Sequence, residues 1–147
     1  MGSLKAGQKA PEGSLNHPFH GGFDAWFYQG LAGIEPDSDQ AGFKHFFLKP
    51  GLFRQIFRAE AAYQSLYGRI RSSWRSAGGV FTWDVVIPAN TSATVFIPTI
   101  DAERIMEGQG PASVSPGVQF LRLERGFAVY ELGSGVYAFQ SPIAPLR

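Results

Sequence analysis

Turn-forming residues divide most of this chain into short segments, and their spacing limits the folds available to it. Runs rich in β-branched and aromatic residues recur about every 8 to 15 residues across residues 43–140. Glycine-containing turn sequences separate several of these runs, at residues 78–79, 125–126 and 133–135. We therefore expect a mainly β fold, an antiparallel β-sandwich of jelly-roll-like form.

Eight segments have the composition of strands. They are residues 43–50, 53–63, 67–75, 80–87, 91–97, 117–124, 127–132 and 136–140. Within residues 67–75 the side chains alternate, which places Arg69, Arg71, Ser73 and Arg75 on one face and Ile70, Ser72 and Trp74 on the other. We expect Trp74 and Trp83 to lie in the core rather than to form a sugar-binding platform.

One helix precedes the strands. Apolar residues recur at spacings of three and four over residues 23–33, and Gly33 and Pro36 predict where the helix ends. The residues that carry this pattern are Phe23, Trp26, Phe27, Leu31 and Ile34. A helix this apolar needs neighbours, and the sequence predicts no second helix to cover it.

Composition excludes several classes of protein. The chain has no cysteine, so it forms no disulfide and no thiolate metal site. Its net charge of +1 lacks the electrostatic footprint of a nucleic-acid-binding protein, and no apolar run is long enough to cross a membrane. Residues 1–14 lack the apolar core of a signal peptide, which makes the cytoplasm the default expectation. We expect residues 1–13 to be a flexible tail.

The densest polar and aromatic cluster is at residues 14–22. Asn16 and His17 could bind a hydroxyl-rich ligand there, because both side chains donate and accept hydrogen bonds. The residues alone favour the alternative that Asn16 caps the approach to the helix and His17 is structural. His17 and His20 lack a third metal ligand, so we expect no metal site and no cofactor.

Two charged groups have structural interpretations that we favour. The arginines are expected to form the solvated face of a sheet rather than a polyanion site; they are Arg54, Arg58, Arg69, Arg71 and Arg75. Asp101, Glu103 and Glu107 are expected in a solvated loop, because nothing in their spacing predicts a hydrolytic carboxylate pair.

Several ordered motifs resemble the C-terminal part of bacterial α-L-rhamnosidases, glycoside hydrolase family 78. The motifs are S-L-N-H at residues 14–17, A-G-I at 32–34, P-D at 36–37, G-F-K at 42–44, Y-G-R-I at 67–70, I-P-A-N-T-S-A-T-V at 87–95 and G-S-G-V-Y-A-F at 133–139. The first motif is followed by Trp26 and Tyr28, and the Y-G-R-I motif by Trp74. The order of these motifs makes the resemblance specific, although each one alone is weak.

The resemblance implies that the chain contains parts of two domains. Residues 14–42 would be the terminal loop and helix of an (α/α)6 barrel, and residues 43–147 the C-terminal β-sandwich. The complete enzyme would hydrolyse terminal α-L-rhamnose with inversion, using a carboxylic acid and a carboxylate. Both belong to barrel segments before residue 14, and Glu12 has no matching motif around it, so the chain is not expected to be catalytic alone. His17, with Asn16, would contact rhamnose.

Three hypotheses about partners follow. As part of a rhamnosidase without its barrel, the chain would self-associate through an exposed helix face made of Phe23, Trp26, Phe27 and Leu31. It could instead be a stand-alone carbohydrate-binding or accessory module. It could also be a complementing subunit of a split enzyme, active only when mixed with a separate barrel. In each case the ligand is a rhamnose-containing glycoside or oligosaccharide.

Overall fold

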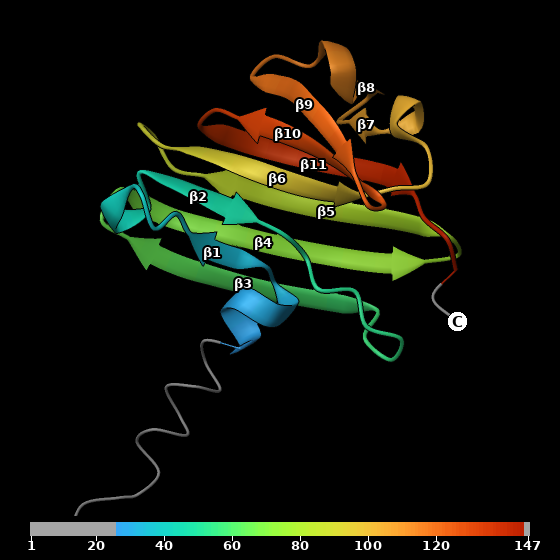
Figure 1. Ribbon diagram of the computed structural model, residues 1–147, viewed down its shortest axis with the longest axis horizontal. Helices are drawn as coiled ribbons and strands as arrows, with labels where there is room; N and C mark the ends of the chain where they lie inside the picture. Colours follow the sequence, from blue (N-terminus) through green and yellow to red (C-terminus); the bar gives the residue numbers. More distant parts are fainter. Residues whose placement is uncertain (1–25, 146–147) are drawn as a thin grey trace, which may run out of the picture.

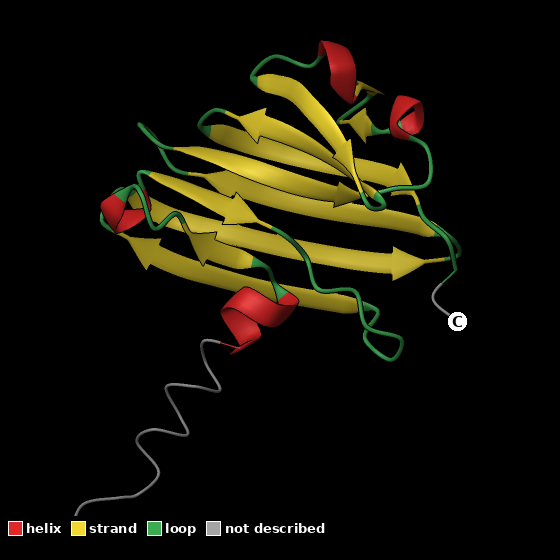
Figure 2. Ribbon diagram, in the orientation of Figure 1, coloured by secondary structure: helices red, strands yellow, loops and turns green. Residues whose placement is uncertain are grey.

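The computed structural model describes residues 26–145, which form two β-sheets with a short helix beside them (Figures 1 and 2). The helical segments are η1 (Trp26–Leu31), η2 (Ala41–Phe43), η3 (Ala102–Arg104) and η4 (Ala112–Val114). The strands are β1 (Ile34–Pro36), β2 (His45–Leu48), β3 (Arg58–Ser65), β4 (Gly68–Ala77), β5 (Val80–Ile87), β6 (Ser92–Pro98), β7 (Met106–Glu107), β8 (Gly110–Pro111), β9 (Val118–Glu124), β10 (Phe127–Leu132) and β11 (Gly135–Pro142).

The strands form a sandwich, as the sequence predicts. Sheet A has the order β1-β2-β6-β10-β9, and sheet B has the order β3-β4-β5-β11-β7-β8. All pairs are antiparallel except β2 with β6, where His45 lies opposite Ser92. This parallel pair differs from the expectation of a wholly antiparallel fold. It arises because the chain crosses to sheet B after β2 and returns to sheet A only at β6.

Most predicted strands are present, and two have the predicted bounds, β5 and β10. The alternation predicted for β4 is confirmed, with Ile70, Ser72 and Trp74 buried and Arg69 and Arg75 exposed. Strand β3 begins later than expected. The backbone N–H of Ile56 donates to the carbonyl of Phe53, and this turn replaces the first part of the predicted strand.

Strand β1 was not predicted, and neither were the two-residue strands β7 and β8. Strand β1 is the one beside the helix. It has three residues, and its pairing with β2 places Ile34 opposite Leu48 in sheet A. The sheet therefore starts ahead of residue 43.

The core lies between the sheets and contains several large aromatic side chains. Trp74 and Trp83 are 2% and 1% exposed, which confirms them as core residues. Phe81 packs between them, with ring centroids 5.9 Å from each tryptophan. Sheet A contributes Phe46 and Tyr130 to the same cluster. Large rings from both sheets thus fill the interior at positions set by the strand alternation.

The predicted aromatic helix is present in the structure as η1, a short π-helical segment beside β1 and β3 (Figure 1). It ends at Leu31 because Gly33 has a φ of +74°, in the left-handed region, and the chain then turns into β1.

Candidate functional site: the junction between the helix and the sandwich

The sugar contacts predicted from the sequence, Asn16 and His17, lie outside the described residues, as do His20, Glu12 and Phe23. The structure instead shows how the segment that follows them is joined to the sandwich. That junction runs from Leu31 to Gly33, where η1 meets β1.

Three side chains of sheet B hold the end of the helix. The indole N–H of Trp74 donates to the carbonyl of Leu31 at 2.8 Å, and the hydroxyl of Ser72 donates to the carbonyl of Ala32 at 2.7 Å. The indole N–H of Trp83 donates to the Ser72 oxygen at 2.9 Å. The last carbonyls of a helix have no partner within it, and here the core of sheet B supplies one.

Every member of this hydrogen-bonded chain is buried. Ser72 is fully buried, and among the described residues no buried side-chain nitrogen or oxygen lacks a partner. In a low-dielectric interior such bonds are strong, and leaving one unmade is costly. The junction is therefore fixed in position rather than loosely packed.

Two glycines let the backbones approach closely at the same place. A Cβ on Gly33 would lie 2.0 Å from the carbonyl oxygen of Lys49, and one on Gly51 would lie 1.8 Å from the carbonyl oxygen of Gly30. The backbone N–H of Lys49 donates to the carbonyl of Gly33 at 2.8 Å. The segment after β2 thus lies directly on the end of η1, with no space for a side chain between them.

This junction corrects one sequence expectation. Leu31 is only 6% exposed, so it is not part of a free apolar helix face. The prediction treated the missing barrel as the only available cover, whereas the sandwich itself covers this residue. The side chains of Trp26 and Phe27 lie outside the described part of the structure, and the expectation for them stays a prediction.

A second polar cluster joins the β1–β2 connection to sheet A. His45 Nδ1 lies 2.8 Å from a carboxylate oxygen of Asp37, and its Nε2 lies 3.0 Å from the Thr94 hydroxyl oxygen. The Thr94 hydroxyl donates to Glu131 at 2.7 Å, and Glu131 also lies 3.3 Å from His45 Nε2. Strands β2, β6 and β10 are thus linked across their outer face.

The Asp37 carboxylate is stabilised in its charged form. The backbone N–H of Asp39 donates to it at 2.9 Å, and this bond together with His45 lowers the pKa of Asp37 below its ordinary value of 3.8. Pro36-Asp37 belongs to one of the motifs recognised in the sequence, whereas His45 was not predicted as a site residue. A signal was present, because a histidine follows Gly42-Phe43-Lys44 at the start of a strand.

Asp101 and Glu103 lie at η3 after β6, whereas Glu107 lies in strand β7 rather than in the expected loop. Asp101 accepts from the backbone N–H of Glu103 and caps η3. Glu107 accepts from the hydroxyl of Ser115 and from the backbone N–H of Ala138. Across residues 26–145, no group of three or more histidine and acidic side chains has an arrangement that could hold a metal ion.

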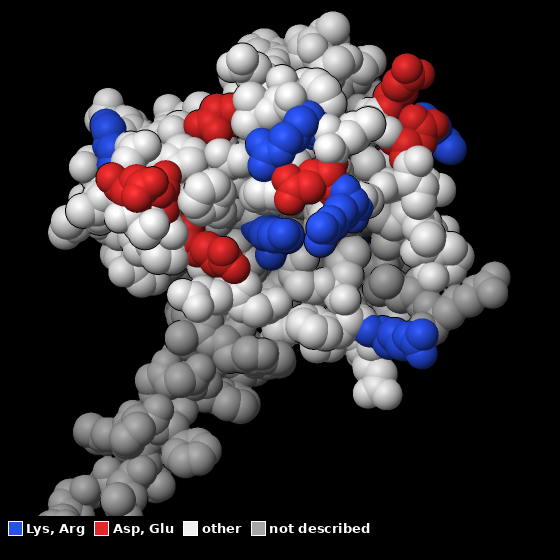
Figure 3. Space-filling view, viewed as in Figure 1, with Lys and Arg blue, Asp and Glu red and all other residues white. Residues whose placement is uncertain are grey.

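Basic and acidic residues lie side by side on one face of the molecule (Figure 3). Figure 3 shows Lys and Arg interspersed with Asp and Glu on the face in view. In sheet B, Arg71 pairs with Glu60 at 2.9 Å, and Arg69 and Arg75 are exposed on the same side of β4. The expected solvated face is therefore present for Arg58, Arg69, Arg71 and Arg75, whereas Arg54 lies in the turn before β3. Among residues 26–145, no helix is long and apolar enough to span a membrane.

Comparison with known proteins identifies the fold. Residues 33–112 match the family described as the bacterial alpha-L-rhamnosidase C-terminal domain. The chain belongs to this family. The match begins at Gly33, at the junction itself, and extends through the first eight strands and into η4.

Curated relatives agree over most of the chain. An alpha-L-rhamnosidase of Streptomyces avermitilis is 33% identical over 90% of this chain, and one of Formosa agariphila is 31% identical over 88%. The chain spans only 12% and 13% of the length of these two relatives.

Solved structures show the same sandwich. The Streptomyces avermitilis alpha-L-rhamnosidase complexed with L-rhamnose superposes with a TM-score of 0.73 at 31% identity, covering 86% of this chain and 11% of that one. The alpha-L-rhamnosidase from Dictyoglumus thermophilum superposes with a TM-score of 0.71 at 24% identity, covering 90% of this chain and 15% of that one, which supports the fold alone.

Proposed function

We propose that this chain serves as the C-terminal sandwich of an α-L-rhamnosidase whose catalytic acid and base come from a separate barrel region. The complete enzyme would hydrolyse terminal α-L-rhamnose with inversion of configuration. The family match over residues 33–112 carries this proposal. Its support is that relatives named as rhamnosidases contain this segment as about an eighth of their length.

The sandwich would hold the segment that precedes it in a fixed position. Trp74 and Ser72 fix the carbonyls of Leu31 and Ala32, so the chain before η1 leaves the sandwich from a defined point. Catalytic and binding groups must be held within a fraction of an ångström of their productive positions. In this proposal, residues 14–33 complete the barrel rather than residues 14–42, because β1 already pairs with β2 in sheet A. Asn16 and His17 contact the rhamnose.

A graft onto a relative tests the proposal. The Streptomyces avermitilis rhamnosidase would be shortened to remove the part that matches this chain, and residues 14–147 would be fused in its place. We expect the shortened enzyme to be inactive on an aryl α-L-rhamnoside and the graft to recover hydrolysis. As a control for the fusion point, the native Streptomyces avermitilis segment would be fused again at the same position.

Two variants of the graft sharpen the result. His17→Ala should lower kcat/KM by removing a sugar contact. Ser72→Ala should lower activity because the segment before the sandwich is held less firmly, and it should affect KM less. A soluble, folded graft with no more activity than the shortened enzyme would contradict the proposal, provided that the control joint is active.

A further inference from the structure

The outer face of sheet B contains a polar hollow that the proposed rhamnosidase role does not use. It has a volume of about 550 Å³, within the range of small-ligand sites. Three adjacent strands supply its polar side chains, which are Arg58, Glu60, Ser73, Arg75, Thr82 and Asp84. All six belong to the alternate positions of β3, β4 and β5 that face away from the core.

Strand register arranges these side chains in two rows. In the first row Arg58 lies opposite Arg75, and Arg75 lies opposite Thr82. In the second row Glu60 lies opposite Ser73, and Ser73 lies opposite Asp84. A basic row therefore runs parallel to an acidic row, and a hydroxyl group belongs to each.

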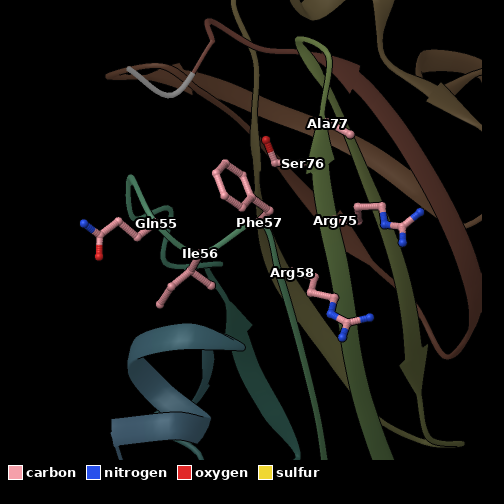
Figure 4. Close-up of a pocket in the computed structure, with 7 residues that line it drawn as sticks. All are labelled: Gln55, Ile56, Phe57, Arg58, Arg75, Ser76 and Ala77. Atoms are coloured by element: carbon pink, nitrogen blue, oxygen red, sulfur yellow. The ribbon is translucent and has the colours of Figure 1, made fainter.

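Within residues 26–145, the two arginines of the basic row have no carboxylate partner. Like charges directly opposite each other destabilise an antiparallel pair. Glu60, the nearest acidic residue on β3, is held by Arg71 at 2.9 Å instead. No ion pair within 4 Å involves Arg58 or Arg75 among the described residues. Figure 4 shows both side chains extending from neighbouring strands to the same side, away from Phe57.

The chemistry of the rows selects a ligand. Two adjacent guanidinium groups bind a carboxylate well, since each presents several N–H donors in a fixed plane. Ser73 and Thr82 can donate to or accept from sugar hydroxyls, and Glu60 and Asp84 can accept from them. The same two carboxylates disfavour multiply charged phosphates. We propose that this hollow binds the carboxylate and ring hydroxyls of an acidic sugar, such as a uronic acid residue of a glycan.

A second hollow adjoins the first and provides space for another sugar unit. It has a volume of about 630 Å³, shares Arg58 and Arg75, and is lined also by Ile56 and Phe57. Phe57 is 57% exposed, so an apolar ring is available beside the polar hollow. Sugar rings have apolar C–H patches as well as hydroxyls, and the two hollows together offer both kinds of surface.

Titration of the full chain tests the proposal without any rhamnoside. Sodium D-galacturonate, D-galactose, sodium acetate and inorganic phosphate would be added to the ¹⁵N-labelled 16.0 kDa protein and followed by amide chemical shifts. We expect galacturonate to bind with a Kd of about 1 mM or tighter and to shift amides of β3, β4 and β5. Galactose lacks the carboxylate and acetate lacks the hydroxyls, so each should bind at least about tenfold more weakly.

Charge variants locate the site. Arg75→Gln and Arg58→Gln should each weaken galacturonate binding by about tenfold or more. Arg69→Gln is the matched control, because Arg69 lies on the same face of β4 opposite Gln64 and outside both hollows. It should leave the Kd within about twofold. Circular dichroism confirms that each variant is folded.

Several outcomes would overturn the proposal. They are the absence of any galacturonate-induced shift, binding of acetate or phosphate as tight as that of galacturonate, or an equal loss in Arg69→Gln. The last result would indicate diffuse surface charge. Because no rhamnoside hydrolysis enters the measurement, this proposal and the rhamnosidase proposal can fail independently.

Discussion

The two edges of sheet A are built in opposite ways. Strand β1 forms one edge with only three residues and ends in Pro36, and the segment before it is bonded to the core of sheet B. Strand β9 forms the other edge with seven residues, and Phe120, Leu121 and Leu123 on it are 48%, 42% and 66% exposed. A short, proline-ended edge resists further strand pairing, whereas a long apolar edge does not. The contrast shows that two edge strands of one sheet can differ in how readily they pair with a further strand.

The largest effect is expected from breaking the close approach beside β1. Gly33→Ala would place a Cβ 2.0 Å from the Lys49 carbonyl oxygen at a φ of +74°. We expect a loss of about 2–4 kcal/mol in the free energy of unfolding, from backbone strain and overpacking together. Denaturant unfolding followed by tryptophan fluorescence measures it.

Gly126→Ala is the matched control for this substitution. Gly126 has a φ of +86°, but a Cβ there would meet no atom within 4 Å. It should cost only the left-handed strain, about 1–2 kcal/mol. Equal losses at the two positions would show that the contact with Lys49 contributes nothing to the edge.

Removing the buried hydroxyl should have the next largest effect. Ser72→Ala leaves the indole N–H of Trp83 and the carbonyl of Ala32 without their partner. The expected cost is about 1–3 kcal/mol, measured by the same unfolding experiment. Ser73→Ala, one residue along on the outer face, should change stability by less than about 0.5 kcal/mol. A comparable loss from both variants would contradict the assignment of Ser72 as the anchor.

The hydrogen bonds that Asp37 makes with the Asp39 backbone and with His45 lower its pKa and make the β1 edge sensitive to acid. A carboxyl group whose pKa is lowered on folding stabilises the fold above its unfolded pKa, and that stabilisation is lost as the pH falls. Asp37→Asn should therefore lower the Tm at about pH 6. The difference in Tm between this variant and the unmodified protein should become smaller towards about pH 3.

Thermal melts across this pH range check the prediction, with Asp39→Asn as the control. Asp39 contributes its backbone N–H to the contact, and the substitution keeps that group. A gap for Asp37→Asn that is constant with pH would show that the charge of Asp37 is not what matters.

The smallest effect on the free energy of unfolding is expected at β9, the exposed edge of sheet A. Leu123→Lys replaces a side chain that is 66% exposed on β9, and it should change the free energy of unfolding by no more than about 0.5 kcal/mol. Sedimentation should show equal or less self-association, because lysine on an edge strand opposes pairing. A loss comparable to that of Ser72→Ala would mean that β9 is covered after all, and the comparison of the two edges would fail.

Local pattern was enough to predict most of the long strands but not the short strands β1, β7 and β8 or the contacts between distant segments. Strands β5 and β10 have the predicted bounds because alternation and flanking turns lie within the same short segment. The cluster around His45 was missed because its partners Thr94 and Glu131 lie 49 and 86 residues away in sequence. Only the sheet topology brings these side chains together.

Ser72 is an intermediate case. Its position on the core side of β4 was predicted from alternation, and a polar residue there requires a hydrogen-bond partner. The sequence did not show which carbonyl would supply it. The parallel neighbour of β2 was unpredictable for the same reason, since nothing near residues 45–48 indicates that β6 is adjacent.

The parallel pairing of β2 with β6 also has a consequence for synthesis on the ribosome. Phe46 and Leu48 are fully buried in the finished fold, yet they are translated well before Val95, which pairs with Leu48. At about 5–20 residues per second, several seconds pass between the synthesis of β2 and that of β6, its partner on the side away from β1. Throughout that interval β2 is a natural target for chaperones. Sheet B can form first, because successive hairpins connect its first three strands, β3, β4 and β5.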